Sequence, residues 1–383
     1  VVRMVRRVRP QDGRWPSNNL PSRQRQPSAS LTAVNPGPIQ PSLRAGEDSA
    51  SERAATDGTG AQNPGGSASA LRKMTGFVRQ PVSPRAYRRF TFAALLLLGI
   101  IVLTGAAVRL TGSGLGCADW PRCSDTEVIG TLSGHQGVEQ ANRLFTGAVS
   151  VAVAAAVLGA VRRRPYRRSL TVWAWSLVAG VVAQIVWGGV TVLTDLNPAV
   201  VIGHFLISMV LVWSATVLHV RAGDADGAGG PSPVKPGALP RVSVAARSAG
   251  AALALVVLTG PVVTGTGPHA GDATAPRFGF NLTSVVRLHS LTAWLLVGAV
   301  VWLAIEAGRS GDGPTIFRAQ IIVLLTLAQG AIGYTQYALG VPPVLVAAHI
   351  VGVTLLVVAV TRLVLLTPVT PGARPLLPWA STE

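Results

Sequence analysis

The feature that most constrains this chain is a series of eight apolar runs, each about 20 residues long. Such a run can cross a hydrocarbon core about 30 Å thick, and it must be helical because lipid cannot satisfy backbone polar groups. Only 13% of the 383 residues are charged, against about 25% in a typical soluble domain. The predicted fold class is therefore an all-α integral membrane protein. The expected spans are 90–110, 139–161, 169–193, 198–220, 242–264, 285–305, 318–339 and 344–366.

The net charge of +17 does not indicate nucleic-acid binding, because much of the excess lies before residue 81 and in short loops between apolar runs. Basic loops of this kind orient membrane proteins, and all of them face the cytoplasm if both chain termini are cytoplasmic. We therefore predict a multi-pass protein of the plasma membrane with outward loops 111–138, 194–197, 265–284 and 340–343. The basic loop residues are Arg85, Arg88, Arg89, Arg162, Arg163, Arg164, Arg167, Arg168, Arg221, Lys235 and Arg241.

The domain organisation follows from composition and from the runs. Residues 1–84 are rich in Pro, Gly, Ser, Gln and Arg and lack apolar periodicity, so we expect a disordered basic extension. The chain begins with Val, and an alternative start at Met74 is one interpretation of this segment. The remaining predicted units are a four-helix half over 85–222, a cytoplasmic linker over 223–241, a second four-helix half over 242–367 and a cytoplasmic tail over 368–383.

An internal repeat relates the two halves. A set of four positions recurs at a constant offset of 145 residues, and Leu103-Thr104-Gly105 matches Leu258-Thr259-Gly260. These matches indicate a duplication. Both halves enter the membrane from the same side, so the repeat is parallel and predicts two four-helix bundles related by an axis along the membrane normal. The offset pairs are Gln184 and Gln329, Gly188 and Gly333, Pro198 and Pro343, and His204 and His349.

Two histidines in the second half are candidate ligands of heme iron. His289 and His349 lie near the starts of the sixth and eighth spans, at similar depth from the outer face. Two neutral imidazoles on facing helices at one depth are what a six-coordinate heme needs. The alternative is that each histidine makes an interhelical hydrogen bond. Because ionisable groups inside membranes are mostly functional, we favour the ligand interpretation.

The first half offers an incomplete counterpart of this pair. His204 is the repeat mate of His349, whereas the mate of His289 falls near residues 142–144, where Asn142 occurs. Glu139 lies one helical turn before Asn142 and shares its face, so it is a candidate catalytic or substrate-gating carboxylate. An ion pair between Glu139 and Arg143 is the structural alternative. His135, one further turn toward the outer loop, is a candidate replacement ligand.

Cys117 and Cys123 are the only cysteines, and both lie in the loop 111–138 that we place outside. An oxidising compartment would allow them to form a disulfide, whose role would be structural or would involve thiol exchange with a substrate or partner. The glycine-rich run 112–116 follows a membrane helix rather than a strand, so it does not indicate a phosphate loop. We expect His219 and His269 to be solvated rather than ligands.

Together these features resemble the heme A synthase family. The most specific stretch runs Arg109-Leu-Thr-Gly-Ser-Gly-Leu-Gly-Cys-Ala-Asp-Trp-Pro-Arg-Cys123, which is similar to that family's first outer loop. The eight spans, the duplication and the histidines at the starts of spans four, six and eight also match, over residues 85–366. This chain departs from the family's second-span Glu-x-x-His-Arg motif, because it has Asn142 between Glu139 and Arg143.

The resemblance implies an enzyme that oxidises the C8 methyl of heme O to the formyl group of heme A, for cytochrome oxidase. It implies a heme b on His289 and His349 and a substrate-heme site around His204, Asn142, Arg143, His135 and Glu139. Heme would supply the redox chemistry and the protein its orientation, burial and axial ligands. Implied partners are heme O, heme O synthase, oxidase assembly factors and the lipid bilayer, and a homo-oligomer is compatible with this scheme. The alternatives are a b-type cytochrome that only transfers electrons and a transporter with a parallel repeat.

Overall fold

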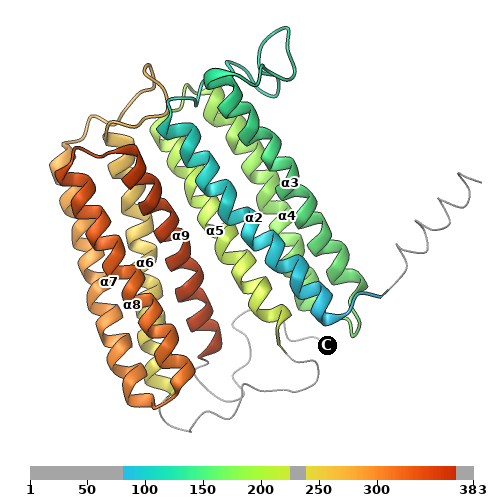
Figure 1. Ribbon diagram of the computed structural model, residues 1–383, viewed down its shortest axis with the longest axis vertical. Coiled ribbons are helices and arrows are strands. Elements are labelled where there is room, and N and C mark those ends of the chain that lie inside the picture. Colours follow the sequence, from blue (N-terminus) through green and yellow to red (C-terminus); the bar gives the residue numbers. More distant parts are fainter. Residues whose placement is uncertain (1–80, 225–238, 368–383) are drawn as a thin grey trace, which may run out of the picture. The chain divides into compact units, whose positions relative to one another are not determined.

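The computed structural model describes residues 81–224 and 239–367, and within them it contains eight helices long and apolar enough to cross a membrane. The helices account for every predicted span, so the predicted eight-helix membrane fold is confirmed (Figure 1). The predicted extension up to residue 80, the linker segment 225–238 and the tail 368–383 lie outside the described residues. The helices are α2 (Pro84–Leu110), α3 (Gly134–Arg162), α4 (Arg168–Leu193), α5 (Pro198–Ala222), α6 (Leu239–Thr266), α7 (Leu282–Ser310), α8 (Gly313–Ala338) and α9 (Pro343–Leu366).

The helices pack as two closed rings of four. In the first half α2 contacts α3 and α5, and α4 contacts α3 and α5; the second half repeats this arrangement with α6, α7, α8 and α9. Each ring encloses an apolar core, which includes Leu98 and Leu177 in the first half and Leu303 and Ile322 in the second. The two rings meet through α2, α5, α6 and α9 and lie side by side in Figure 1. The prediction of two four-helix bundles is thereby confirmed.

The bounds of the helices extend the repeat found in the sequence. Helices α4 and α8 begin and end at positions that differ by 145 residues, and α5 and α9 begin at prolines with the same offset. The turns between them also match, because Leu196 and Val341 both have positive φ angles, of 59° and 63°. Positive φ is uncommon for a non-glycine residue. Its recurrence at equivalent positions supports a duplication of whole helix pairs rather than of isolated motifs.

Most of the helices are longer than the apolar runs that predicted them, and four of them begin at a polar cap. Ser83, Asn197, Asn281 and Asp312 each accept a hydrogen bond from a backbone N–H in the first turn, and prolines occupy the first positions of α2, α5 and α9. Helix α3 begins at Gly134, so the predicted outward loop 111–138 was too long. Likewise α6 begins at Leu239, inside the predicted linker.

One end of the helices carries the loops 111–133, 194–197, 267–281 and 339–342, and we call it the disulfide end. The two halves are joined there by loop contacts. Gly114 N–H donates to Gly271 O at 2.9 Å, and Arg109 donates to the carbonyls of His269 and Thr264 at 2.6 and 3.0 Å. A side chain on Gly114 would lie 3.1 Å from the Gly271 oxygen, so glycine permits this close approach. These contacts bring together loops that are far apart in the sequence.

Candidate functional site

His289 and His349 face each other in the second half, near the disulfide end. His289 is on α7 and His349 on α9, and their ring centres lie 6.4 Å apart with an angle of 76° between the planes. His289 Nδ1 shares a 3.0 Å hydrogen bond with the hydroxyl of Thr259, on α6. That hydroxyl also lies 3.1 Å from the carbonyl of Leu255, to which it can donate. When Thr259 donates to that carbonyl, its oxygen accepts from His289 Nδ1–H, and this tautomer leaves Nε2 as the lone-pair donor that a metal needs.

This pair fits one heme iron. A metal–imidazole nitrogen distance of about 2 Å places the ring centres of two trans imidazoles about 6 Å apart. The observed 6.4 Å agrees, and His349 Nδ1 is buried without a hydrogen-bond partner in the described structure. Gly260 makes room for the His289 ring, because a Cβ there would lie 3.2 Å from Cε1. A Cβ on Gly333 would be in ordinary contact with His349, 3.6 Å from Cε1. The donor set and its spacing thus suit bis-imidazole ligation.

His204 holds the equivalent position on α5 in the first half. Its Nδ1 is buried without a hydrogen-bond partner in the described structure, as for His349. Gly188 on α4 lies against its ring, with the Cβ position 3.3 Å from Cε1. Gln184 donates to the His204 carbonyl at 3.0 Å and also to the Ser208 hydroxyl, which holds α4 against α5. The packing around this imidazole repeats that around its mate in the second half.

Asn142 stands where His289 stands in the second half. The hydroxyl of Thr104, on α2, donates to Asn142 Oδ1 at 2.8 Å. Thr104 is the repeat mate of Thr259, whose hydroxyl bonds His289. The sequence predicted this mate only to within three residues, and the shared threonine contact selects Asn142. The first half therefore has one imidazole at the two paired positions, and the second half has two.

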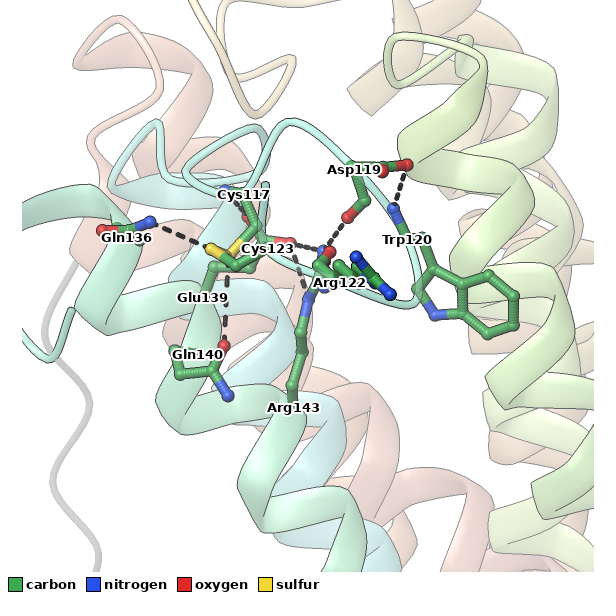
Figure 2. A network of polar contacts seen from close by, with 9 residues as sticks. All are labelled: Cys117, Asp119, Trp120, Arg122, Cys123, Gln136, Glu139, Gln140 and Arg143. Carbon is green, nitrogen blue, oxygen red and sulfur yellow. Dashed lines mark hydrogen bonds and ion pairs between the residues drawn. A yellow bond between two sulfur atoms is a disulfide. The ribbon is translucent and has the colours of Figure 1, made fainter. Parts of the chain in front are cut away.

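Glu139 is the centre of a buried polar network one turn from Asn142 (Figure 2). Only 5% of the residue is exposed. One carboxylate oxygen accepts from Arg143 Nε at 3.0 Å and Nη2 at 2.5 Å, and the other accepts from the Cys117 backbone N–H at 2.8 Å. Arg143 also donates to the carbonyls of Asp119 and Arg122, both at 3.2 Å. The carboxylate and the guanidinium together fasten the loop that precedes α3 to that helix.

The fastened loop is closed by the Cys117–Cys123 disulfide, which confirms the predicted pairing. Both cysteines are buried, and Gln136 Nε2 donates to Cys123 Sγ at 3.0 Å (Figure 2). Trp120, at the tip of the closed loop, packs on α4 over Gly189, where any side chain would collide with the indole. The disulfide loop therefore covers the last turns of α4 at Gly189, one residue after the glycine that contacts the His204 ring.

The other three histidines, His135, His219 and His269, lie away from the paired positions, and each is hydrogen-bonded to another part of the chain. His135 is the second residue of α3 rather than a loop residue, and its Nδ1 lies 2.9 Å from the Ser113 hydroxyl. His219 bonds the Thr91 hydroxyl at 3.0 Å, and His269 bonds the Val341 carbonyl at 2.8 Å. The last two are partly buried.

A comparison of the sequence with protein families gives a match. The family of cytochrome oxidase assembly proteins named COX15-CtaA matches residues 88–136 and 130–361, which is well over half of the chain. The chain belongs to this family. The resemblance drawn from the first loop and the repeat is thus confirmed at the level of the family.

Among curated members of the cytochrome oxidase assembly protein family, similar sequences are heme A synthases. That of Geobacillus kaustophilus is 37% identical over 112 residues, which cover 28% of this chain and 34% of the relative. That of Lysinibacillus sphaericus is 30% identical over 149 residues, or 37% of this chain and 48% of the relative. The matched stretches therefore span between a third and a half of the length of these relatives.

Sequence reasoning found the imidazoles, the carboxylate and the cysteines but missed the residues that position them. Thr104, Thr259 and Gly260 belong to the repeated Leu-Thr-Gly block, which was read only as a sign of duplication. A polar residue repeated within an apolar run was the available signal, because such residues inside membranes are usually bonded to another helix. In this chain, Thr259 bonds His289 in the second half and Thr104 bonds Asn142 in the first.

Proposed function

We propose that this protein is a heme A synthase that oxidises the C8 methyl of heme O to a formyl group. The observation that carries the proposal is the difference between the halves, one with a complete imidazole pair 6.4 Å apart and one with a single imidazole at the paired positions. A resident cofactor needs fixed ligation, whereas a substrate must enter, react and leave. Family membership and the partial matches to heme A synthases support the same assignment.

In this proposal His289 and His349 hold a heme b in the second half, and the heme supplies one-electron redox chemistry when bound. The protein contributes orientation of the imidazoles. The Thr259 hydroxyl fixes the tautomer and rotation of His289, in the way that partners of metal-bound histidines commonly do. The alternative role, an interhelical hydrogen bond, is met by His289, whose Nδ1 bonds Thr259 on α6, but not by His349, whose buried Nδ1 has no hydrogen-bond partner in the described structure. The bond of His289 engages only one ring nitrogen and leaves Nε2 for a metal.

The first half binds heme O through His204, with Glu139, Asn142 and Arg143 beside it. Glu139 holds the disulfide loop through its bond to the Cys117 N–H, and it is the only acidic side chain within one turn of Asn142 on α3. We propose that it holds or moves a proton at its carboxylate during methyl oxidation while Arg143 balances its charge. His135 Nδ1 is hydrogen-bonded to the Ser113 hydroxyl. This contact favours a role in holding the loop over the role of substrate ligand that was predicted from sequence.

The disulfide end faces outward from the plasma membrane, and both termini are cytoplasmic, in the orientation we propose. Arginines gather at the opposite end, at the start of α2 and between α3 and α4, as cytoplasmic loops require. Independently, a disulfide forms and persists in oxidising compartments outside the cytoplasm. Heme O synthase and oxidase assembly factors are the proposed partners, since one delivers the substrate and the others consume the product.

The test is expression of the chain together with heme O synthase in a host without heme A, followed by pigment extraction. We expect heme A in the extract, and only heme O from cells that carry heme O synthase alone. Retention of heme b with no heme A, in cells that accumulate heme O, would refute the proposed reaction. That result would favour the alternative of a b-type cytochrome that only transfers electrons.

A further inference from the structure

The two halves differ at the position of Asn142 and His289, and this difference bears on how the substrate heme is bound. We infer that the first half holds heme iron through His204 alone and that Asn142 offers a hydrogen-bond donor at the open coordination position opposite it. The ligand class for that position is a small uncharged molecule of the size of water or carbon monoxide. The inference rests on the proposed function, which assigns this half to heme O.

The first step is the equivalence of Asn142 and His289. Each is bonded to the threonine of a Leu-Thr-Gly block, at 2.8 Å for Asn142 and 3.0 Å for His289. The threonines are repeat mates on α2 and α6, so the two bonded side chains occupy equivalent places in the two bundles. Where the second half presents a ligand nitrogen, the first half presents a carboxamide. An amide oxygen is a hard, weakly basic group, and heme iron in proteins is held by other side chains.

The second step is the space left by the smaller side chain. A Cβ on Gly260 would lie 3.2 Å from the His289 ring, whereas a Cβ on Gly105, its repeat mate, would meet nothing within 4 Å. The region occupied by an imidazole edge in the second half is therefore open in the first. That space lies beside Asn142 because Thr104, which bonds Asn142, directly precedes Gly105.

The third step concerns which end of the amide faces the open space. The Thr104 hydroxyl lies 2.8 Å from Asn142 Oδ1 and 3.2 Å from the Ile101 carbonyl, so the nearer oxygen takes its proton, and no hydrogen bond reaches Asn142 Nδ2 from the described part of the chain. The amide N–H groups are thus available to a molecule in the space. In heme proteins the donors and polarity opposite the axial ligand decide which small molecules bind there.

The remaining candidate for a second ligand is His135, and its position does not suit this role. It precedes Asn142 by seven residues on α3, which at 1.5 Å per residue places it about 10 Å further along the helix axis. Its Nδ1 is also engaged by the Ser113 hydroxyl. Thus, among the described histidines near the disulfide end, His204 is the one at the depth of the paired site in the first half.

Carbon monoxide added to the reduced, purified protein tests the inference, with the protein prepared from cells that also express heme O synthase. A six-coordinate bis-histidine heme resists carbon monoxide, whereas a heme with an open position binds it. We expect one of the two hemes to take carbon monoxide and the other to stay low-spin. Asn142→His should lower the carbon monoxide affinity at least tenfold and convert the first-half heme to a low-spin spectrum. The reciprocal His289→Asn should make the second-half heme reactive.

A further variant distinguishes the effect of the Asn142 amide donor from the effect of the open coordination position. Asn142→Leu keeps the approximate size of the side chain but removes the amide, so carbon monoxide should still bind, with its stretching frequency shifted to a higher wavenumber. An unchanged frequency would overturn the role of the amide. Two bound hemes that are both low-spin and unreactive in the wild-type protein would overturn the inference while leaving the proposed function intact. A preparation that holds a single heme and forms no heme A in cells that accumulate heme O would instead refute the proposed function.

Discussion

Gly260 offers a quantitative test of the heme b site, because its repeat mate provides a matched control. A methyl group on Gly260 would lie 3.2 Å from His289 Cε1, against ordinary contacts of 3.4–4 Å, so the ring must move by at least 3.4 − 3.2 = 0.2 Å. The ring is also held by the 3.0 Å bond to Thr259, which resists that movement. Disturbing a residue that orients a metal ligand usually costs 10–100-fold in affinity. We expect Gly260→Ala to weaken heme b binding about tenfold, or about 1.4 kcal/mol.

The assay is the rate of heme b transfer from the detergent-solubilised protein to apomyoglobin, together with the ratio of heme b to protein. Gly105→Ala is the control, because its added methyl group meets nothing within 4 Å. Both substitutions gain about 1 kcal/mol of helix propensity, so this effect cancels between them. Equal transfer rates in the Gly260→Ala variant and the wild type would refute the packing argument. Equal acceleration in both variants would show that the effect is not local to His289.

Three further predictions follow from the site. Either His289→Ala or His349→Ala should abolish the low-spin heme b spectrum, since each removes one of the two proposed ligands, whose ring centres lie 6.4 Å apart. An unchanged spectrum in both variants would contradict the assignment. Glu139→Ala should eliminate heme A formation while retaining heme b. In Glu139→Gln the disulfide loop should be more protected from proteolysis than in Glu139→Ala, because the amide oxygen can still accept from the Cys117 N–H. Normal heme A yield in Glu139→Ala would exclude a proton-transfer role. Cys117 and Cys123 should resist thiol alkylation until a reductant is added, and labelling of both without reduction would disprove the disulfide in the isolated protein.

The asymmetry between the halves gives the duplication a functional meaning. The framework of four helices, the threonine on the first helix of each half and the histidine on the last are shared. The position on α3 and α7 differs, and so do the loops that precede these helices, because only the first half has the disulfide loop with its Glu139 anchor. In the proposed function, one ancestral site serves two roles, a retained cofactor in one copy and a transient substrate in the other.

Much of the fold was predictable because a membrane restricts the choices of a chain. Apolar runs of sufficient length must be helices in lipid, so the sequence alone determined the number and order of the helices. The offset of 145 residues determined the pairing of the halves, and two cysteines in one loop left a single possible disulfide. Hydropathy failed at the helix ends, such as the start of α3 at Gly134, because polar first turns extend beyond the apolar run.

The tertiary structure alone decided which side chains meet between helices. Spacing placed Glu139 and Asn142 on one face, but only the folded chain brings the Cys117 N–H to the carboxylate and Thr104 to the amide. The contacts of Arg109 with the other half also depend on how loops from separate repeats approach one another. The physical reason is that hydropathy reports the transfer of a segment into lipid, which is a local property. Ligand geometry depends instead on distances between side chains of different helices, and those distances are set by packing.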